Sequence, residues 1–487
     1  MQPYLFIPED RSFFRDARPM SSETGSGGHG ARWPDPSQIF TAVHGALHLA
    51  FPRPQAWEHN HPTGRNGDYP DRGNRPQRFG SLTTVGPFPC QWDSEAKQWR
   101  WLFPRPADVV LTDGLKRLHP IQESGGGCDL AAPLRYSLGN PCPPTKVEPA
   151  SWWTREAWQA YLGESTAQVD RTSFRQTEEL YGAEWTPGIG MDPGTQAQDG
   201  ERIYSAQYLR LREDVAFGFA AAMPMTDADA LPNLWQVSNA LIFGGQQCHG
   251  NVFPADKVPL RDCAAETIGE TLPASVTGDM SRGRVKWTLL TPAVFPAIKG
   301  NPACAINAHP GGWLPNWVFL DWDEEAGVAR PNERNGLVLL KHRSGQVRRV
   351  WDETKKRTVR RAEVETTISA RLVAACVSKP VYISGWSDRK HLPERGDDPV
   401  VKELKLQTGS DPRAGYYAVP AGAAYYFEIS GGEDPSLLVD LLSWHGQNPP
   451  DPQVPIRRRS TLFGEQGFGL GVCSSWDFFE PAAKSDS

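Results

Sequence analysis

Apolar and polar residues along this chain follow strand and helix periods in separate stretches. A short apolar run at residues 4–7 predicts a first strand, and small apolar residues at 38–50, after a PDPS run, predict a helix. Residues 202–222 alternate between apolar and polar before they become fully apolar. This pattern predicts a β-hairpin with residues 212–214 in its turn. The chain therefore opens with a βα unit, and further strands follow it.

The rest of the chain adds many short strands and few helices. Few helices among several strands favour an α+β class, which we expect to be divided into two domains at residues 1–225 and 226–487. Residues 25–30, 52–79 and 122–149 are rich in Gly, Pro, Asn or Arg, which predicts long loops. The remaining predicted strands lie at 81–88, 109–111, 240–243, 285–291, 317–320, 336–341, 365–377 and 424–429, and the helices at 154–162, 174–181 and 435–444.

Composition is that of a globular protein with no general attraction to nucleic acid. The 487 residues are 22% charged and 39% hydrophobic, and the net charge is −6. Because free-standing nucleic-acid binders are usually basic, any RNA or DNA contact here must be a local patch. Without a signal-like N-terminal region or a long apolar run, a soluble cytoplasmic protein is expected. Eight scattered cysteines without a C-x-x-C pair favour reduced thiols over disulfides or zinc.

The turn after the first strand carries candidate RNA-binding chemistry. It reads FRDARP at residues 14–19, and a Gly/Ser loop follows it. Arg15 and Arg18 can form charge-assisted hydrogen bonds, and bare backbone N–H groups suit a phosphate-rich ligand. A structural ion pair of these arginines with Asp16 is the alternative. We favour RNA contact.

A glycine-rich run near the C-terminus is a second candidate. Gly464, Gly467, Gly469 and Gly471 follow an RRR triplet at 457–459. Residues without a Cβ permit φ > 0, so successive N–H groups can converge on an anion. The run is not a Walker loop, because the Lys-Ser/Thr pair is missing, and it lacks the βαβ context of a dinucleotide site. A tight hairpin packed on a sheet explains it equally well.

Residues 341–361 are a third candidate, with nine Lys/Arg against two acids. Alternation around the valines of this segment predicts an exposed hairpin with basic faces. Each contact of such a side chain with a phosphate would add salt-sensitive, sequence-independent affinity. A solvated ribbon without a partner is the alternative.

Three segments with catalytic-looking letters form no convincing site. The HNH triplet at 59–61 lacks the ββα-metal context, and DWDEE at 321–325 is better explained as an acidic turn. His44 lies on the predicted first helix with no Ser, Cys or carboxylate arrangement tied to it, so a packing or surface role is expected. The chain is therefore predicted not to be an enzyme.

Several short motifs occur along the chain in a recognisable order. They are FRDARPM at 14–20, PDPS at 34–37 with GAL at 45–47, GIGMD at 188–192 with GERIY at 200–204, LLTPA at 289–293, SGW at 384–386, VPAGAAYYFE at 419–428 and GFG at 467–469. In this order they resemble the RAMP (repeat-associated mysterious protein) subunits of CRISPR effector complexes, above all the subunit-three family of the type III-B Cmr complex. One turn departs from that family: FGGQQCH at 243–249 lacks both the acid and the arginine of its L-G-G-E-G-R motif.

The resemblance implies two ferredoxin-like (RRM-like) domains with long loop insertions and a C-terminal glycine-rich loop. It implies a non-catalytic subunit that binds the 5′ handle of the CRISPR RNA and bridges the large polymerase/cyclase-like subunit to the backbone RAMP subunit in antiviral defence. No cofactor, metal or membrane contact is expected. Together with the basic and glycine-rich segments, the predicted RNA-binding residues are Arg15, Arg18, Ser37, Gly244, Gly245, His249, Lys341, Arg343, Arg348, Arg349, Gly464, Gly467, Phe468, Gly469 and Gly471.

Two other functions compete with this one. A metal-independent endoribonuclease that processes the precursor CRISPR RNA would use His44 or His29 as a general base. A nucleotide-binding regulator would hold a triphosphate with residues 464–471.

Overall fold

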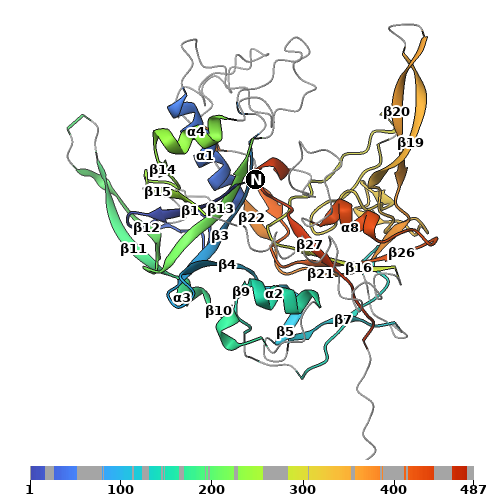
Figure 1. Cartoon of the computed structure of the whole chain (residues 1–487), viewed down its shortest axis with the longest axis horizontal. Coiled ribbons are helices and arrows are strands. Elements are labelled where there is room, and N and C mark those ends of the chain that lie inside the picture. The colour runs from blue at the N-terminus through green and yellow to red at the C-terminus, as the bar shows by residue number, and fades with distance from the viewer. Residues whose placement is uncertain are drawn as a thin grey trace, which may run out of the picture.

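The described part of the chain is built mainly on two antiparallel sheets, of eight and four strands, with few helices (Figure 1). This confirms the predicted α+β class. Arg18, the HNH triplet and most of residues 52–79 lie outside the described residues. The computed structural model describes residues 2–16, 27–51, 79, 82–111, 115–122, 131–143, 146, 148–163, 169–191, 194–195, 198–223, 229–255, 283–304, 306–352, 357–383, 386–387, 411–412, 415–443 and 463–479.

The first sheet has eight strands and is covered by helices on both faces. Its strand order is β10-β9-β4-β3-β13-β1-β15-β14. The strands are β1 (Gln2–Pro8), β3 (Thr83–Asp93), β4 (Gln98–Pro104), β9 (Trp152–Thr154), β10 (Phe174–Arg175), β13 (Val215–Ala222), β14 (Ala240–Ile242) and β15 (His249–Pro254). Successive side chains of a strand point to opposite faces. Tyr4 and Phe6 of β1 therefore join the core under α1 (Pro36–Ala50) and α4 (Ala230–Val237), while Leu5 joins the core under α2 (Arg155–Leu162).

Helix α1 begins where the sequence predicts. The Asp35 carboxylate accepts a hydrogen bond from the Ser37 backbone N–H at 2.8 Å, and Pro36 occupies the first turn. Ile39, Val43 and Leu47 then repeat every four residues and are fully buried.

The predicted hairpin at 202–222 is wrong in its pairing, although the turn at 212–214 is present. The first strand, β12 (Gln198–Leu211), pairs with β11 (Tyr181–Met191) and with β2 (Gly27–Gly28) in a separate sheet. The second strand, β13, lies between β3 and β1. The reason is burial: β13 is apolar and buried on both faces, so it occupies a central position in the sheet.

The second sheet has four strands in the order β21-β26-β16-β27. They are β21 (Ala370–Cys376), β26 (Ala424–Ile429), β16 (Arg284–Leu289) and β27 (Gly471–Ser474), and α8 (Ser436–Leu442) packs against them. If these four strands are numbered in chain order, their order in the sheet is second, third, first, fourth. The strands β3-β13-β1-β15 of the first sheet have the same order. We call the described residues up to 255 the first half and those from 283 onward the second half. Where the first half has α1, the second half has an irregular segment that packs Leu314, Val318 and Leu320 on its sheet.

Other predicted elements are corrected by the structure. Residues 174–181 form β10, a single turn α3 (Thr177–Leu180) and the start of β11 rather than one helix. Residues 317–320 and 336–340 form no regular strands, although they pair through a bridge between Val318 and Val338 and through backbone hydrogen bonds. Strands β20 and β21 split the strand predicted at 365–377. Strands β14 and β15, which follow the domain boundary predicted at residue 225, belong to the first sheet.

Short ribbons complete the structure. The basic segment forms the projecting hairpin of β19 (Lys341–Asp352) and β20 (Arg357–Thr367), as predicted (Figure 1). A ribbon of β22 (Val381–Ile383) and β25 (Tyr416–Ala418) lies between the two sheets. The remaining elements are β5 (Val109–Leu111), β6 (Lys116–Arg117), β7 (His119–Pro120), β8 (Leu138–Gly139), β17 (Trp322–Asp323), β18 (Val328–Ala329), β23 (Trp386–Ser387), β24 (Asp411–Pro412) and the 3₁₀ turns Arg171–Ser173, Pro302–Cys304 and Gly464–Gln466.

Within the described part of the chain, the search for a helix long and apolar enough to span a bilayer finds none.

Candidate nucleic-acid interface

A cleft of about 800 Å³ lies between the two halves. Its charged lining residues are Arg15, Asp16, Arg32 and Asp35. The first half contributes residues 15–16, 29–36, 86–88, 104, 152, 181–183 and 207–209, and the second half contributes 290–292, 381–383 and 420–421.

The turn that carries Arg15 is held from two sides. On one side the Gly245 N–H donates to the Phe13 carbonyl at 2.7 Å. Gly244 has φ +100° and lies so close that a Cβ would stand 2.6 Å from the same carbonyl oxygen, which requires glycine. On the other side, the Asp16 N–H donates to the His29 carbonyl at 3.0 Å. Arg15 is thereby fixed at the wall of the cleft, and the two glycines support the turn without lining the cleft.

Ser37 lies at the start of α1, where its hydroxyl donates to the Asp35 carboxylate. This carboxylate also caps the helix, so part of the negative charge at the cleft is engaged with helix N–H and O–H groups. His249 lies at the start of β15, where its Nε2 is 3.0 Å from the Glu9 carboxylate. It does not line the cleft.

The glycine-rich run forms a packed junction between the two halves. Gly467 has φ +97°, and a Cβ there would lie 2.7 Å from the Thr84 carbonyl oxygen of β3. The Thr291 hydroxyl donates to the Gly467 carbonyl at 2.7 Å and accepts from the Leu470 N–H at 2.9 Å. The Gly469 N–H donates to the Pro292 carbonyl at 2.7 Å. These N–H groups donate to oxygens of the protein itself, and the run forms a packed turn that leads into β27.

Phe468 and Gly471 are buried within this junction. Phe468 has no exposed surface and packs with Ile383 and Ala418 of the β22–β25 ribbon. Gly471 starts β27 and pairs with Leu289, and Gly464 starts a 3₁₀ turn. RNA contact by these residues stays a prediction, and their observed contacts are with the rest of the fold.

The predicted residues of the basic hairpin lie apart from the cleft (Figure 1). Lys341 is exposed at the base of β19, and Arg343, Arg348 and Arg349 follow along the same strand. In the described register, Arg349 stands opposite Arg361 of β20.

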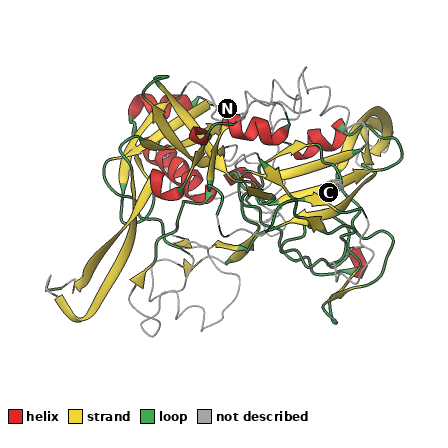
Figure 2. Ribbon diagram, turned by 90° about the horizontal axis from the view of Figure 1, so that it is seen from below, coloured by secondary structure: helices red, strands yellow, loops and turns green. Residues whose placement is uncertain are grey.

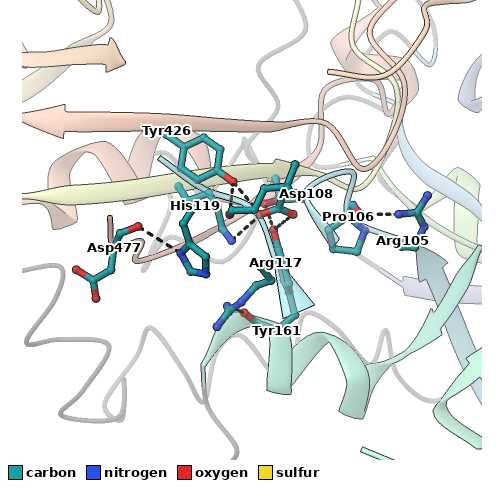
Figure 3. Close-up of polar contacts among 11 residues, drawn as sticks. Arg105, Pro106, Asp108, Arg117, His119, Tyr161, Tyr426 and Asp477 are labelled. Atoms are coloured by element: carbon teal, nitrogen blue, oxygen red, sulfur yellow. Dashed lines mark hydrogen bonds and ion pairs between the residues drawn. The ribbon is translucent and has the colours of Figure 1, made fainter. Parts of the chain in front are cut away.

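A buried ion pair connects the two halves, and Figure 3 shows its acid, Asp108, beside Tyr161 and Tyr426. Asp108 comes from the loop before β5 of the first half, and Lys286 from β16 of the second half. The Lys286 Nζ is 3.0 Å from Asp108 Oδ2, and neither side chain is more than 4% exposed. The hydroxyls of Tyr161 and Tyr426 donate to the same carboxylate at 2.7 and 2.9 Å.

The charges of this pair shift one another's pKa. Burial works to raise the pKa of Asp108, but the Lys286 ammonium and the two tyrosine hydroxyls hold it below its usual value. Burial lowers the pKa of Lys286 to about 8, and the Asp108 charge offsets part of that effect. At neutral pH both groups are therefore charged and satisfied, as a structural pair would be.

Sequence reasoning missed this pair and the exposed aromatic residues beside the cleft. Asp108 and Lys286 are single charged residues with no motif around them. His29 and Trp185 pack edge to face with ring centroids 5.6 Å apart, and Tyr382 and Tyr417 lie 5.4 Å apart. Alternating residues at 381–383 and 416–418 are compatible with strands, but nothing local indicates that these two segments pair.

The residues considered for catalysis are separated in space. His44 stacks on Phe40 along α1 and does not line the cleft, whereas His29 does. Residues 321–325 form a tight turn in which Asp323 Oδ1 accepts from the N–H groups of Glu325 and Ala326, as expected from the sequence. Among the described residues, no cluster of three His, Cys, Asp or Glu side chains could hold a metal ion.

Comparison with known proteins identifies the class. Residues 4–476 match the family described as CRISPR-associated protein (Cas_Cmr3), so this is a RAMP subunit of a type III CRISPR effector complex. The chain belongs to the Cas_Cmr3 family, which confirms the resemblance seen in its motifs. No curated protein matches the sequence.

Solved structures of CRISPR effector subunits are similar to this chain at low identity. One, of a type III-B Cmr-beta complex bound to cognate target RNA and AMPPnP, has 12% identity, covers 61% of this chain and 70% of its own, and gives a TM-score of 0.29. A second, of Cmr-beta bound to cognate target RNA, has 12% identity, coverages of 87% and 86%, and a TM-score of 0.32. A Csm3–Csm4 subcomplex of the type III-A interference complex has 9% identity, coverages of 89% and 94%, and a TM-score of 0.35.

Proposed function

We propose that this chain is a non-catalytic subunit of a type III-B effector complex that holds the 5′ handle of the CRISPR RNA in the cleft between its halves. In the same proposal it bridges the large polymerase/cyclase-like subunit to the backbone RAMP subunit. The observation that carries the proposal is convergence. The Arg15 turn, the start of α1, the LTP segment and the PA segment at 420–421 are distant in sequence and line one cleft.

The cleft suits a single-stranded polyanion. Arg15 and Arg32 supply guanidinium groups, which bind phosphate through two parallel N–H donors. Of the two carboxylates in the lining, Asp16 and Asp35, that of Asp35 is engaged by the helix cap. Aromatic rings beside them offer faces for unstacked bases. A local site of this kind is compatible with a net charge of −6.

The basic hairpin β19–β20 supplies a second proposed RNA contact through Lys341, Arg343, Arg348 and Arg349. Nine basic and two acidic residues between 341 and 361 give this segment a charge of +7 in a chain of net −6, so the remainder carries −13. A phosphate backbone is attracted to such a segment and repelled by the rest of the chain.

Each half is proposed to be one ferredoxin-like unit. In the first half, β1, α1, β3, β13, α4 and β15 follow one another as βαββαβ, and their sheet order is β3-β13-β1-β15. In the second half, β16, β21, β26 and β27 repeat that order with α8 before the last strand. The strand order supports a division between residues 255 and 283 rather than at 225.

Binding of the repeat-derived 5′ RNA by the full chain tests the function. Replacing Arg15 and Arg18 together with alanine removes two charge-assisted contacts, each of about 1.5–3 kcal/mol, and weakens binding at least tenfold. The slope of log affinity against log salt also becomes shallower by about one to two. The matched control is Arg330→Ala, which breaks an exposed pair with Asp323 far from the cleft lining. Equal affinity of the double variant and wild type at moderate salt contradicts the proposal.

The location of His29 at the cleft keeps the endoribonuclease as a second candidate. Incubation of the protein with labelled repeat RNA in EDTA separates the two functions. We expect intact RNA. Specific cleavage that disappears in His29→Ala, but persists in His44→Ala, would instead establish the enzyme.

A further inference from the structure

The β22–β25 ribbon, whose strand β22 lines the cleft, presents two tyrosines to solvent. Tyr382 and Tyr417 stand directly opposite one another in the register of the ribbon, so their side chains share one face. They are 44% and 68% exposed. Tyr382 lines the cleft.

The other face of the same ribbon is anchored in the protein. Ile383 and Ala418 are buried against Phe468 of the glycine-rich junction, and Tyr416 packs edge to face on Phe463. The two faces differ: Ile383 and Ala418 on one are buried, although Val381 on that face is 44% exposed, whereas the other face presents the two exposed tyrosine rings. The ring of Tyr382 is also seated over Gly415, where a Cβ would collide with its hydroxyl and ring atoms.

We propose that Tyr382 and Tyr417 form a stacking site for an unpaired base of the RNA in the cleft. The inference rests on the proposed function and adds to it a residue-level contact on the second half of the protein. Arg15 and Arg32 line the cleft with Tyr382, so phosphates and bases of one strand have complementary groups at the same site. The ring centroids are 5.4 Å apart with planes at 56°, an open V rather than a closed stack. A base therefore finds an uncovered ring face without displacing the partner ring.

This arrangement assigns Phe468 an indirect role. Its ring is fully buried, so it positions the tyrosine ribbon instead of touching RNA. The glycine-rich junction and the cleft are thereby connected through one packed contact.

The test compares two RNAs with the full-length protein. One is the repeat-derived 5′ RNA, and the other is an abasic version of equal length, which keeps the phosphates and lacks the bases. Base–aromatic stacking of ordinary strength corresponds to roughly 5- to 150-fold in affinity per base. We expect Tyr382→Ala with Tyr417→Ala to weaken binding of the base-bearing RNA by at least fivefold and to leave the abasic RNA unchanged. Tyr→Phe at both positions should retain affinity.

Two further variants make the result specific. Gly415→Ala displaces the Tyr382 ring without removing it and should weaken base-bearing RNA alone. Phe253→Ala, which removes a 43% exposed ring from β15, should change neither affinity.

The possible outcomes distinguish a failure of the stacking site from a failure of the proposed RNA binding. If wild type binds both RNAs equally, or the double alanine variant weakens both equally or neither, the stacking site is wrong while RNA capture stands. Loss of partner-subunit assembly with unchanged RNA binding would assign the tyrosines to a protein contact and also overturn the inference. A wild-type protein that binds neither RNA overturns the proposed function as well.

Discussion

The two halves of this protein meet in two ways, and the two places differ in almost every physical property. At the Asp108–Lys286 pair the junction is dry, and each charge has a partner. At the cleft the same halves separate and leave arginines, a histidine and aromatic rings around open space. We infer from this comparison that the buried pair fixes the relative position of the halves, and that the RNA site proposed in the cleft depends on this geometry.

The largest loss of stability is expected when the carboxylate of the buried Asp108–Lys286 pair is removed. Asp108→Ala leaves the Lys286 ammonium buried without a partner, which costs about 3–5 kcal/mol of unfolding free energy. Urea unfolding measures the change. Asp10→Ala is the matched control, because it removes a carboxylate paired with Arg210 at an exposed site and should cost less than about 1 kcal/mol. Similar losses for the two variants would contradict the contrast between buried and exposed charges.

The pKa of Lys286 predicts how the same junction responds to pH. The folded protein holds this pKa at about 8, whereas an unfolded lysine titrates near 10.4. Between these values the unfolded chain binds more protons, so the contribution of Lys286 to stability rises with pH across this window and is constant below it. At about 1.4 kcal/mol per pKa unit, the rise is at most about 3 kcal/mol.

The measurement is the difference in unfolding free energy between wild type and Asp108→Asn with Lys286→Met, taken at pH 7 and pH 10. The variant lacks the titrating group, so wild type should gain stability relative to it at the higher pH. A pH-independent difference would show that the Lys286 pKa is not depressed in the folded protein.

The glycine-rich junction should show a smaller effect on stability. Gly467→Ala combines strain at φ +97° with a contact to the Thr84 carbonyl and should cost about 2 kcal/mol. Gly432→Ala isolates the strain, because its φ is +73° and nothing lies within 4 Å of its added Cβ. Thermal unfolding of both variants should rank Gly467 as the more damaged site. Equal losses would mean that the close approach to β3 contributes nothing.

Local signals predicted elements better than partners. Helix α1 was predictable because Asp35, Pro36 and the spacing of Ile39, Val43 and Leu47 act within the element itself. The pairing partners of β12 and β13 were not predictable, since an alternation of apolar and polar residues does not indicate which strands will pair. The irregular segment that takes the place of a first helix in the second half has no helical or strand periodicity, so the sequence did not indicate it.

The candidate site was predicted in part for the same reason. Arg15 and the glycine-rich run could be predicted because residue type alone identifies a basic turn and a cluster of glycines. The packing role of the glycine-rich run depends on the close approach of Gly467 to Thr84, and these residues are 383 positions apart in the chain. Asp108 and Tyr382 acquire their importance only from burial and exposure, which a single sequence does not display.

The central place of β1 has a consequence for synthesis. This strand pairs on one side with β13 and on the other with β15. Both edges therefore stay unpaired until segments more than 200 residues downstream have been synthesised. At ordinary translation speeds of about 5–20 residues per second, that wait lasts roughly 10–50 seconds. During it, the apolar residues 4–7 leave the ribosome as an uncovered strand edge. The emerging chain is thus a natural client for chaperones that bind short apolar segments until translation completes the sheet.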